Sequence, residues 1–527
     1  MNTATFRNEP FTDWSDAANV EAMQRALAQV RNELGKTYPL VINGEHITTD
    51  KTIESRNPAN PSEVVGRAAS ASVEQAEQAI EAANTAFETW RKVPAATRIE
   101  LVRKIAAAIR QRKFEFAAWL VYEVGKTWVE ADADVAEAID FCMFYAQEME
   151  RFAGPQPVNQ LPGERDDVVY VPLGAGVAIP PWNFALAITT GLTVSPIVTG
   201  NTVVLKPSPR SPIIATKLME VIESVGAPAG VVNFVTGEDA VIGDVLVDHP
   251  KTRFISFTGS KEVGLRIFER AAKRQPGQKW LKRTILEMGG KDTLVVDETA
   301  DLDAAAEAIT ASAFGFSGQK CSACSRVVAV EKIYEPLLQK VVEHARALRL
   351  GDPSNPNTAM GAVIDERSLD KIRQYSDIGK QEGRLLLGGE LPSDGSLMVP
   401  PTIFADVAPD ARLSQEEIFG PVLTFVKAKD YDEALEIANN TEFGLTGGVF
   451  SQDQDRLRRA REDFHVGNLY FNRKITGAMV GAHPFGGFNM SGTDSKAGGR
   501  DYLLQFLQMK SIAERLAPDT GTARGGE

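Results

Sequence analysis

Residues 202–258 read TVVLKPSPRSPIIATKLMEVIESVGAPAGVVNFVTGEDAVIGDVLVDHPKTRFISFT, and this stretch decides the fold. Short apolar runs alternate in it with longer segments whose apolar residues recur at helical spacing. The expected strands are 202–206, 231–235 and 253–258, and the expected helices are 213–225 and 240–247. Strands that alternate with helices are typical of a parallel sheet covered by helices, so we expect an α/β fold.

The same alternation begins again after Glu287. It predicts strands at 293–296 and 326–330 and helices at 304–316 and 335–348. A chain of 527 residues is also too long for one ordinary core, so two or three domains are expected. Two α/β units therefore meet near Glu287, and domain junctions are where ligand sites tend to form.

The N-terminal part of the chain is predicted to be mostly helical. An amphipathic segment around 19–34 lies within an arm of residues 1–38, residues 41–45 have hairpin chemistry, and helices are expected at 73–91, 95–124 and 128–152. Residues 168–205 hold no charged side chain, and an uncharged segment of this length could span a membrane. Their prolines and glycines would break a spanning helix, so we expect a strand, a turn, a helix and a strand in a buried parallel sheet.

The composition indicates which binding partners and which cellular compartment to expect. The formal net charge of -13 argues against a nucleic-acid partner, because phosphate binding needs a basic surface. Three cysteines are too few for a disulfide framework, and residues 1–14 hold no apolar segment typical of a secretory signal. We expect a cytoplasmic protein with a small-molecule substrate, no membrane span and a disordered tail at 517–527.

Cys321 ends the run FGFSGQKC at 314–321, and Glu287 lies upstream in LEMGGK at 286–291. A thiol attacks carbonyl groups as the thiolate, and the thioester that forms needs an activated water for its release. One cysteine and one carboxylate among glycines are therefore suited to acyl chemistry. The alternative is that Cys321 is a small buried apolar residue, as free cysteines often are.

Cys321 and Cys324 form a Cys-x-x-Cys pair. A regulatory disulfide between them is an alternative that the sequence leaves open. No second pair follows and the five histidines are scattered, so no metal site is expected.

Further candidate residues follow the apolar strands. Asn183 lies in PWNF (181–184), where an amide can donate to a developing oxyanion, although a turn asparagine often satisfies its own backbone. Gly237 and Gly243 follow one predicted strand, where backbone N–H groups between a strand and a helix can face a pyrophosphate. Lys206 ends another strand and could contact ribose or phosphate; a solvated lysine is the alternative.

Together these motifs closely resemble the aldehyde dehydrogenase superfamily over roughly residues 40–510. The motifs that match, in the family's order, are PWNF (181–184), FTGS (257–260), LEMGGK (286–291), GQKC (318–321), EEIFGP (416–421) and PFGG (484–487). The resemblance implies a Rossmann-type cofactor domain, an α/β catalytic domain and a β-hairpin oligomerisation element.

The resemblance also implies roles for single residues. Cys321 would attack an aldehyde to give a thiohemiacetal whose oxyanion is held by Asn183, and Glu287 would activate the water that hydrolyses the thioester. The implied cofactor is NAD⁺, in contact with Lys206, Gly237, Gly243, Ser260, Glu417, Phe419 and Trp182. Pro209 stands where many relatives have a glutamate that binds the adenosine ribose, with Arg210 beside it. NADP⁺ use is therefore left open.

One branch of the superfamily is most similar, the 1-pyrroline-5-carboxylate dehydrogenases, also called L-glutamate γ-semialdehyde dehydrogenases. The resemblance rests on the N-terminal arm, on GQKCSA (318–323) and on FHVGNLYFNRKITGA (464–478). It implies that Ser322 and the Gly477-Ala478 turn hold the substrate carboxylate and that Glu137 meets its ammonium group. Phe184 and Phe485 would wall its aliphatic chain. Without the resemblance, Ser322 would be a backbone cap and the phenylalanines ordinary core residues.

The architecture of the family implies a division of the chain and an assembly. The implied units are an arm (1–38), an NAD-binding domain (39–154 and 172–286), a catalytic domain (287–487) and an oligomerisation element (155–171 and 488–516). A homodimer is implied, a hexamer is left open, and proline dehydrogenase would supply the substrate. The rival interpretations are a dehydrogenase for succinate or aminoadipate semialdehyde, an inactive family member with a binding role, and a membrane-anchored protein.

Overall fold

A computed structural model describes residues 6–516, and its first core is built on a seven-stranded sheet. The strand order is β11-β10-β7-β8-β9-β2-β3, and the first five strands are parallel. Their bounds are β2 (Leu40–Ile42), β3 (Glu45–Ile47), β7 (Ala175–Ile179), β8 (Thr202–Leu205), β9 (Val232–Phe234), β10 (Phe254–Thr258) and β11 (Arg283–Glu287). The parallel sheet and the hairpin expected near residue 43 are both confirmed.

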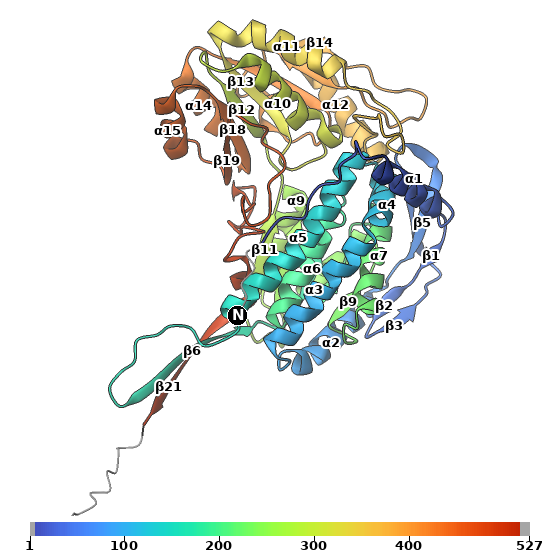
Figure 1. Cartoon of the computed structure of the whole chain (residues 1–527), viewed down its shortest axis with the longest axis vertical. Helices are drawn as coiled ribbons and strands as arrows, with labels where there is room; N and C mark the ends of the chain where they lie inside the picture. Colours follow the sequence, from blue (N-terminus) through green and yellow to red (C-terminus); the bar gives the residue numbers. More distant parts are fainter. Residues whose placement is uncertain (1–5, 517–527) are drawn as a thin grey trace, which may run out of the picture.

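A second seven-stranded sheet forms the other lobe in Figure 1. Its order is β14-β15-β16-β13-β12-β18-β19, parallel except for β14 at the edge. Its strands are β12 (Asp292–Val296), β13 (Cys324–Val330), β14 (Arg384–Leu387), β15 (Thr402–Ala405), β16 (Val422–Ala428), β18 (Thr446–Phe450) and β19 (Asn468–Phe471). Since β11 ends at Glu287 and β12 starts at Asp292, Glu287 lies where the chain passes from one sheet to the other.

Helices cover both sheets. Around the first sheet they are α1 (Ala17–Arg31), α2 (Val73–Trp90), α3 (Ala95–Gln111), α4 (Lys113–Val124), α5 (Trp128–Phe152), α6 (Ala187–Thr199), α7 (Pro212–Ser224), η1 (Asp239–Gly243), α8 (Asp244–Asp248) and α9 (Lys261–Ala272). Around the second they are α10 (Leu302–Phe314), η2 (Gly315–Gly318), η3 (Glu331–Ile333), α11 (Tyr334–Arg346), α12 (Glu366–Glu382), α13 (Arg412–Gln415), α14 (Tyr431–Asn439) and α15 (Gln454–Asp463).

The expected single helix at 95–124 is wrong, because α3 and α4 are separate. Arg112 breaks the helix with φ -106° and ψ 20°. Its guanidinium pairs with Glu115 at 2.6 Å and with Glu220 of α7 at 3.5 Å, at the point where the chain passes from α3 to α4. Apolar periodicity continues across Arg112 and gives no sign of this turn.

The segment without charged residues folds as the sequence predicted. It contains the end of β6 (Glu164–Pro172), then β7, a turn, α6 and β8. β7 and β8 are neighbours in the parallel sheet. Among the described residues no helix is both long and apolar enough to cross a bilayer.

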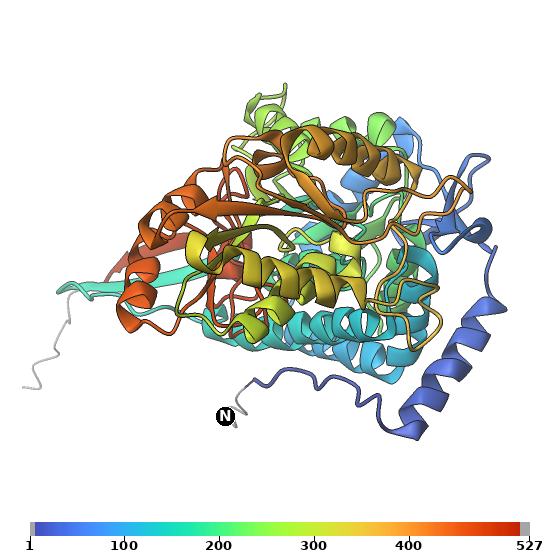
Figure 2. The same ribbon diagram turned by 90° about the horizontal axis from the view of Figure 1, so that it is seen from above.

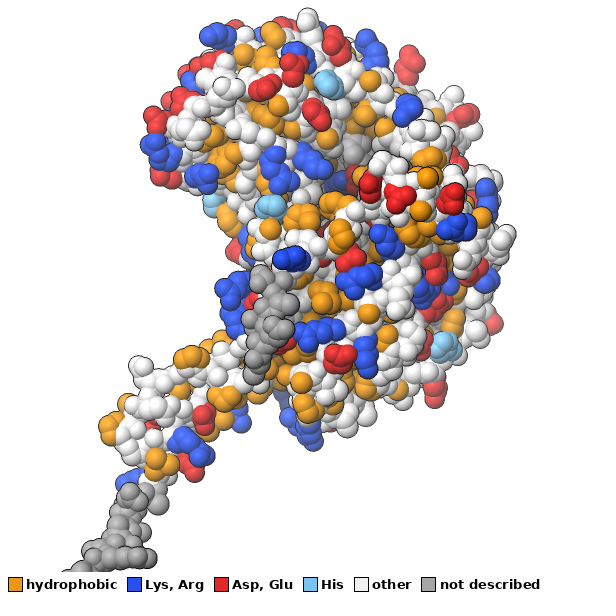
Figure 3. All heavy atoms as spheres, in the orientation of Figure 1, with side chains coloured by type: hydrophobic (Ala, Val, Ile, Leu, Met, Phe, Trp, Pro, Cys, Tyr) orange, Lys and Arg blue, Asp and Glu red, His pale blue; other side chains and the backbone are white. Residues whose placement is uncertain are grey.

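A two-stranded arm extends from the body. β6 pairs antiparallel with β21 (Leu507–Arg515) over nine residues each, and Figures 1 and 3 show the arm projecting into solvent. Met509 is 61% exposed there, and Leu161 in the connecting loop is 58% exposed. β21 and β6 both fall largely within the segments implied for the oligomerisation element, and they pair with each other within the chain. The predicted disordered tail lies outside the described residues.

The structure also contains two small sheets. They are β1-β5-β4, with β1 (Thr37–Tyr38), β4 (Thr52–Asn57) and β5 (Asn60–Ala69), and β17-β20, with β17 (Phe443–Gly444) and β20 (Phe488–Asn489). The chain then passes through η4 (Tyr502–Phe506) into β21.

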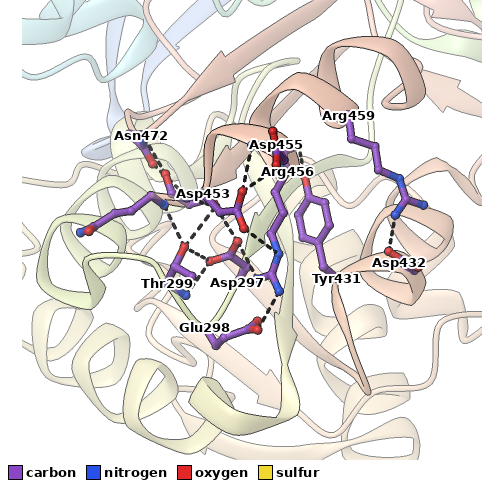
Figure 4. A network of polar contacts seen from close by, with 12 residues as sticks. Asp297, Glu298, Thr299, Tyr431, Asp432, Asp453, Asp455, Arg456, Arg459 and Asn472 are labelled. Carbon is purple, nitrogen blue, oxygen red and sulfur yellow. Dashed lines mark hydrogen bonds and ion pairs between the residues drawn. The ribbon is translucent and has the colours of Figure 1, made fainter.

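A polar network fastens α15 to the second sheet (Figure 4). Arg456 lies 3.0 Å from the fully buried carboxylate of Asp297 and 2.7 Å from Glu298, and its guanidinium lies over the ring of Tyr431. A buried carboxylate is stable only when it is paired and hydrogen-bonded, and Asp297 has both kinds of partner, including Ser451. The network is structural and lies apart from the cavity described next.

Candidate active site

The two lobes enclose a cavity of about 90 Å³ at their junction. Its lining includes Thr258 at the end of β10, Glu287 at the end of β11 and Cys321 from the loop before β13. The carboxyl ends of parallel strands meet at one edge of a sheet, which is where α/β proteins bind ligands. The cysteine and the carboxylate singled out in the sequence therefore share one cleft.

The loop that carries Cys321 is held in a strained conformation. Phe316, Ser317 and Gly318 have φ values of 51°, 56° and 68°. A Cβ on Gly318 would lie 2.4 Å from the carbonyl oxygen of Gly420, so only glycine fits there. Left-handed backbone of this kind persists only where its surroundings enforce it, and such strain is common at functional sites.

Side chains around the loop supply that enforcement. Ser317 Oγ donates to the Gly361 carbonyl at 2.8 Å, and Gln319 Oε1 accepts from the Ile364 N–H at 2.8 Å. Asn183 Nδ2 donates to the Gln319 carbonyl at 2.9 Å, two residues before the cysteine. One N–H of the Asn183 amide is thus occupied by the loop, which leaves the other to serve a ligand.

Cys321 is partly exposed to the cavity. Burial raises the pKa of its thiol above the ordinary range, and the nearby carboxylates of Asp292, Glu417 and Glu287 raise it further. Both effects disfavour a negative sulfur, so the ligand-free protein holds Cys321 as a thiol. A base must take the proton when the sulfur attacks.

Glu287 is the carboxylate available as that base. Ser495 donates to one of its oxygens, and the other oxygen, Oε2, is buried without a partner. Burial raises the pKa of Glu287 to about 8, and the Ser495 hydrogen bond and Lys496 act in the opposite direction. A Cβ on Gly486 would lie 1.8 Å from the Ser495 carbonyl oxygen and 2.9 Å from Glu287 Oε1, which explains the glycine at this position of PFGG.

All six residues predicted to contact the substrate line the cavity: Glu137, Phe184, Ser322, Gly477, Ala478 and Phe485. Gly477 has φ 74°, a conformation that favours glycine. Burial raises the pKa of Glu137 to about 8, with Asp134 raising it and Lys126 lowering it. The cavity thus joins an apolar middle to polar groups at its rim.

Sequence reasoning missed several residues of the cavity wall. Phe141 and Tyr145 lie four and eight positions after Glu137 on α5, so helical spacing from Glu137 could have found them. Leu192 of α6 and Tyr502 of η4 also line the cavity. Tyr502 comes from far along the chain, and no local pattern identifies it.

A buried ion pair packs against Phe184 of the cavity lining, and the sequence analysis did not predict it. Lys126 lies 2.9 Å from Asp134, with both side chains fully buried. The Lys126 ammonium is 4.3 Å from the ring centre of Phe184 and 5.0 Å from that of Phe316. Asp134 also accepts from the Ala187 N–H at 2.7 Å, so the pair connects the start of α6 to the cysteine loop.

Comparison with known proteins identifies this arrangement. The chain matches the aldehyde dehydrogenase family over residues 46–512. The chain belongs to this family. The α/β architecture expected from the resemblance is therefore confirmed.

The aldehyde dehydrogenases most similar to the chain share nearly its full length. A protein of Geobacillus sp. (strain WCH70) named 1-pyrroline-5-carboxylate dehydrogenase is 57% identical over 97% of this chain and 99% of its own length. The crystal structure of 1-pyrroline-5-carboxylate dehydrogenase from Thermus with bound NAD has a TM-score of 0.96 and 51% identity, and covers 98% of this chain and 100% of that one. A structure of proline utilization A from Bdellovibrio bacteriovorus has a TM-score of 0.96 and 45% identity, and covers 98% of this chain and 54% of that one.

The cofactor residues predicted for this aldehyde dehydrogenase follow adjacent strand ends. Trp182 comes after β7, Lys206 after β8, Gly237 after β9 and Ser260 after β10. Ser260 Oγ accepts from the Val263 N–H at 3.4 Å and so caps α9, whose N-terminus faces the same edge. Gly243 was predicted to lie between a strand and a helix. Gly243 follows β9 as the last residue of the π-helical turn η1 and immediately precedes α8, within the helical segment predicted at 240–247.

The remaining cofactor candidates, Glu417 and Phe419, lie in the loop between α13 and β16 of the second lobe. Glu417 accepts from the Gly290 N–H at 3.2 Å, and a Cβ on Gly289 would collide with its carboxylate. Phe419 has φ 62° and meets Trp182 edge to face with ring centres 5.7 Å apart.

Two other sequence candidates have partners within the protein. The Lys206 ammonium pairs with Asp239, although the lysine side chain is 2% exposed and the aspartate 69%. Arg210, next to Pro209, pairs with Asp365 at 2.6 Å and lies over the Trp182 ring. Cys324 is free and buried in β13, where its thiol lies 3.5 Å from the Arg326 carbonyl.

Proposed function

We propose that this aldehyde dehydrogenase oxidises L-glutamate γ-semialdehyde, the open form of 1-pyrroline-5-carboxylate, to L-glutamate with NAD⁺ in proline degradation. The observation that carries the proposal is the single cavity lined by Cys321, Glu287, Ser322 and the Gly477-Ala478 turn. It occurs in a chain 57% identical to a protein named for this reaction. The cavity offers a nucleophile, a base and donors for a carboxylate.

The chemistry starts at sulfur. As Cys321 attacks the aldehyde carbon, its proton passes to the carboxylate of Glu287, which lines the same cavity and has one oxygen without a partner. The oxyanion of the thiohemiacetal is held by the second N–H of Asn183 and by the Cys321 backbone N–H. Glu287 then releases that proton to solvent. After the aldehyde hydrogen has left as hydride, the ionised Glu287 takes a proton from water, the hydroxide attacks the thioester, and the Cys321 thiolate leaves.

The cofactor residues fit a dinucleotide. A buried ammonium at Lys206 and the capped N-terminus of α9 at Ser260 would face its phosphates and ribose, with Gly237 and Gly243 nearby. Glu417 would bind the second ribose, and Phe419 and Trp182 would flank the ring. When bound, NAD⁺ supplies the hydride acceptor.

Substrate selection follows from the opposite end of the cavity. Ser322 Oγ and the N–H groups of Gly477 and Ala478 would hold the α-carboxylate without a buried counter-charge. Phe184 and Phe485 would enclose the methylene groups. Glu137 would face the α-ammonium group, which favours the carboxylate form of a side chain whose pKa burial has raised.

The assembly and setting are part of the same proposal. The implied division is the arm 1–38, the NAD-binding domain 39–154 and 172–286, the catalytic domain 287–487, and the oligomerisation element 155–171 and 488–516. The exposed apolar residues of the β6–β21 arm suit pairing with a second copy, as in a homodimer or a larger homo-oligomer. Three free cysteines suit the cytoplasm, and a similarity to about half of proline utilization A suits supply of the substrate by proline dehydrogenase.

The test is NADH formation from 1-pyrroline-5-carboxylate by the purified protein, with Cys321→Ala as the inactive control. A panel with succinate semialdehyde and aminoadipate semialdehyde separates the rival substrates. A kcat/KM for either rival above that for 1-pyrroline-5-carboxylate would reject the proposed substrate. Full activity of the Cys321→Ala variant would reject the proposed mechanism.

A further inference from the structure

The N-terminal segment before α1 does more than cover the helical layer. Figures 1 and 2 show it leaving α1 and crossing the outer side of the helices that include α5. We call residues 6–16 the N-terminal strap and residues 477–481 the anchor loop, which contains Gly477 and Ala478. The strap contacts both α5 and the anchor loop. Residues of α5 and of the anchor loop line the active-site cavity.

Asn8 makes the direct connection. Its Nδ2 donates to Asp140 Oδ2 on α5 at 2.8 Å and to the Val480 carbonyl oxygen in the anchor loop at 3.0 Å. The Glu9 N–H donates to the other oxygen of Asp140 at 2.6 Å. One amide group thus fixes the distance between α5 and the anchor loop.

Apolar contacts repeat the connection beside Asn8. The Phe6 ring meets Phe144 of α5 edge to face, with ring centres 5.2 Å apart. Gly481 lies against both rings, because an added Cβ would come within 3.1 Å of the Phe144 ring and 3.3 Å of the Phe6 ring. Gly481 has φ 80°, so the anchor loop turns away under the strap at a residue that favours glycine.

The strap itself is held in place by contacts that do not involve the anchor loop. Glu9 forms a two-pronged pair with Arg110 of α3 at 2.8 and 2.9 Å. The Thr12 N–H donates to Asp132 of α5 at 2.7 Å, and Trp14 packs on Trp128 with ring centres 5.2 Å apart. A strap fastened at several points can transmit its position to the loop that it touches.

We propose that the N-terminal strap sets the position of the anchor loop over the substrate, with Asn8 as a positioning residue for carboxylate recognition. The inference rests on the proposed function, because it assigns the anchor loop the substrate carboxylate. α5 presents Glu137 and Phe141 to the cavity, and the loop presents Gly477 and Ala478. The strap therefore fixes the spacing between the groups for the ammonium and those for the carboxylate.

The experiment compares Asn8→Ala with Asn19→Ala. Asn19 lies on α1 and donates to the Asp13 carbonyl oxygen at 2.9 Å, so its variant loses a hydrogen bond of the same kind in the same arm, away from the loop. We expect Asn8→Ala to raise KM for the semialdehyde about tenfold with kcat within about twofold, as for loss of two hydrogen bonds to a loop. KM for butanal, which carries no carboxylate, should stay within about twofold in both variants.

A second measurement works without substrate. Hydrogen exchange of the amides in residues 477–482 should be faster in Asn8→Ala than in Asn19→Ala. Asn8→Asp keeps the size but puts a carboxylate beside Asp140, so it should loosen the loop at least as much. If the wild-type protein does not oxidise the semialdehyde but the exchange difference appears, the proposed function fails and the strap–loop coupling stands.

Three results would overturn the inference. One is an unchanged KM for the semialdehyde in Asn8→Ala. Another is an equal rise in KM for the semialdehyde and for butanal, which would mean a general loosening of the cavity. The last is equal exchange in the anchor loop of both variants.

Discussion

The raised pKa of Glu287 has a direct kinetic consequence. A general base acts as the carboxylate, and burial raises the pKa of this group to about 8. At pH 7 about one tenth of it is therefore ionised. The rate of thioester hydrolysis should rise with pH and level off above pH 8, a gain of about tenfold over the value at pH 7.

Ser495→Ala shifts this profile in a predictable direction. The Ser495 hydroxyl donates to Glu287 Oε1 and stabilises the ionised form, so its removal raises the pKa. A hydrogen bond to a charged group contributes about 1.5–3 kcal/mol, and one pKa unit corresponds to about 1.4 kcal/mol. We expect an upward shift of about one unit or more and about a tenfold lower hydrolysis rate at pH 7 that higher pH restores.

The assay follows NADH in the stopped flow. NADH forms before the thioester is hydrolysed, so the burst reports acylation and the steady phase reports hydrolysis. Ser491→Ala is the matched control, since Ser491 lies in the same loop and its hydroxyl accepts from the Gly444 N–H, away from the Glu287 side chain. A steady phase with the same pH midpoint in Ser495→Ala and in the wild type would refute Glu287 as the titrating base. So would a Glu287→Gln variant that keeps the pH dependence.

The other predictions concern substrate, stability and cofactor. Ser322→Ala should raise KM for the semialdehyde about tenfold, because one charge-assisted hydrogen bond to the carboxylate is lost, and kcat should change little. An unchanged KM would count against Ser322 as a carboxylate-binding residue. Lys126→Met should lower the free energy of unfolding by about 3–5 kcal/mol in denaturant titration, because it leaves Asp134 buried without a counter-charge. Adding Asp134→Asn should restore more than half of that loss, and an additive loss would contradict the pairing. Measured kcat/KM values should favour NAD⁺ over NADP⁺ by less than about a thousandfold because Pro209 offers no acceptor to exclude a 2′-phosphate; a larger preference would reject this tolerance.

Local sequence predicted much of the fold because its signals act over a few residues. The apolar runs at 202–206, 231–235 and 253–258 became β8, β9 and β10 of one parallel sheet. The break at Arg112 escaped prediction because apolar periodicity continues across it from α3 into α4.

The sequence by itself predicted the candidate reacting groups of this protein and the element ends that carry them. Cys321, Glu287 and Asn183 were predicted from short motifs, because glycines and turns next to a functional group leave a local signature. Only the tertiary structure decided how those groups are tuned. The raised pKa of Glu287, the strained cysteine loop against Gly420, the Lys126–Asp134 pair and the strap over the anchor loop all arise from contacts between segments far apart in the chain. Burial and hydrogen bonding across such distances depend on the packing of whole elements, which no short stretch of sequence records.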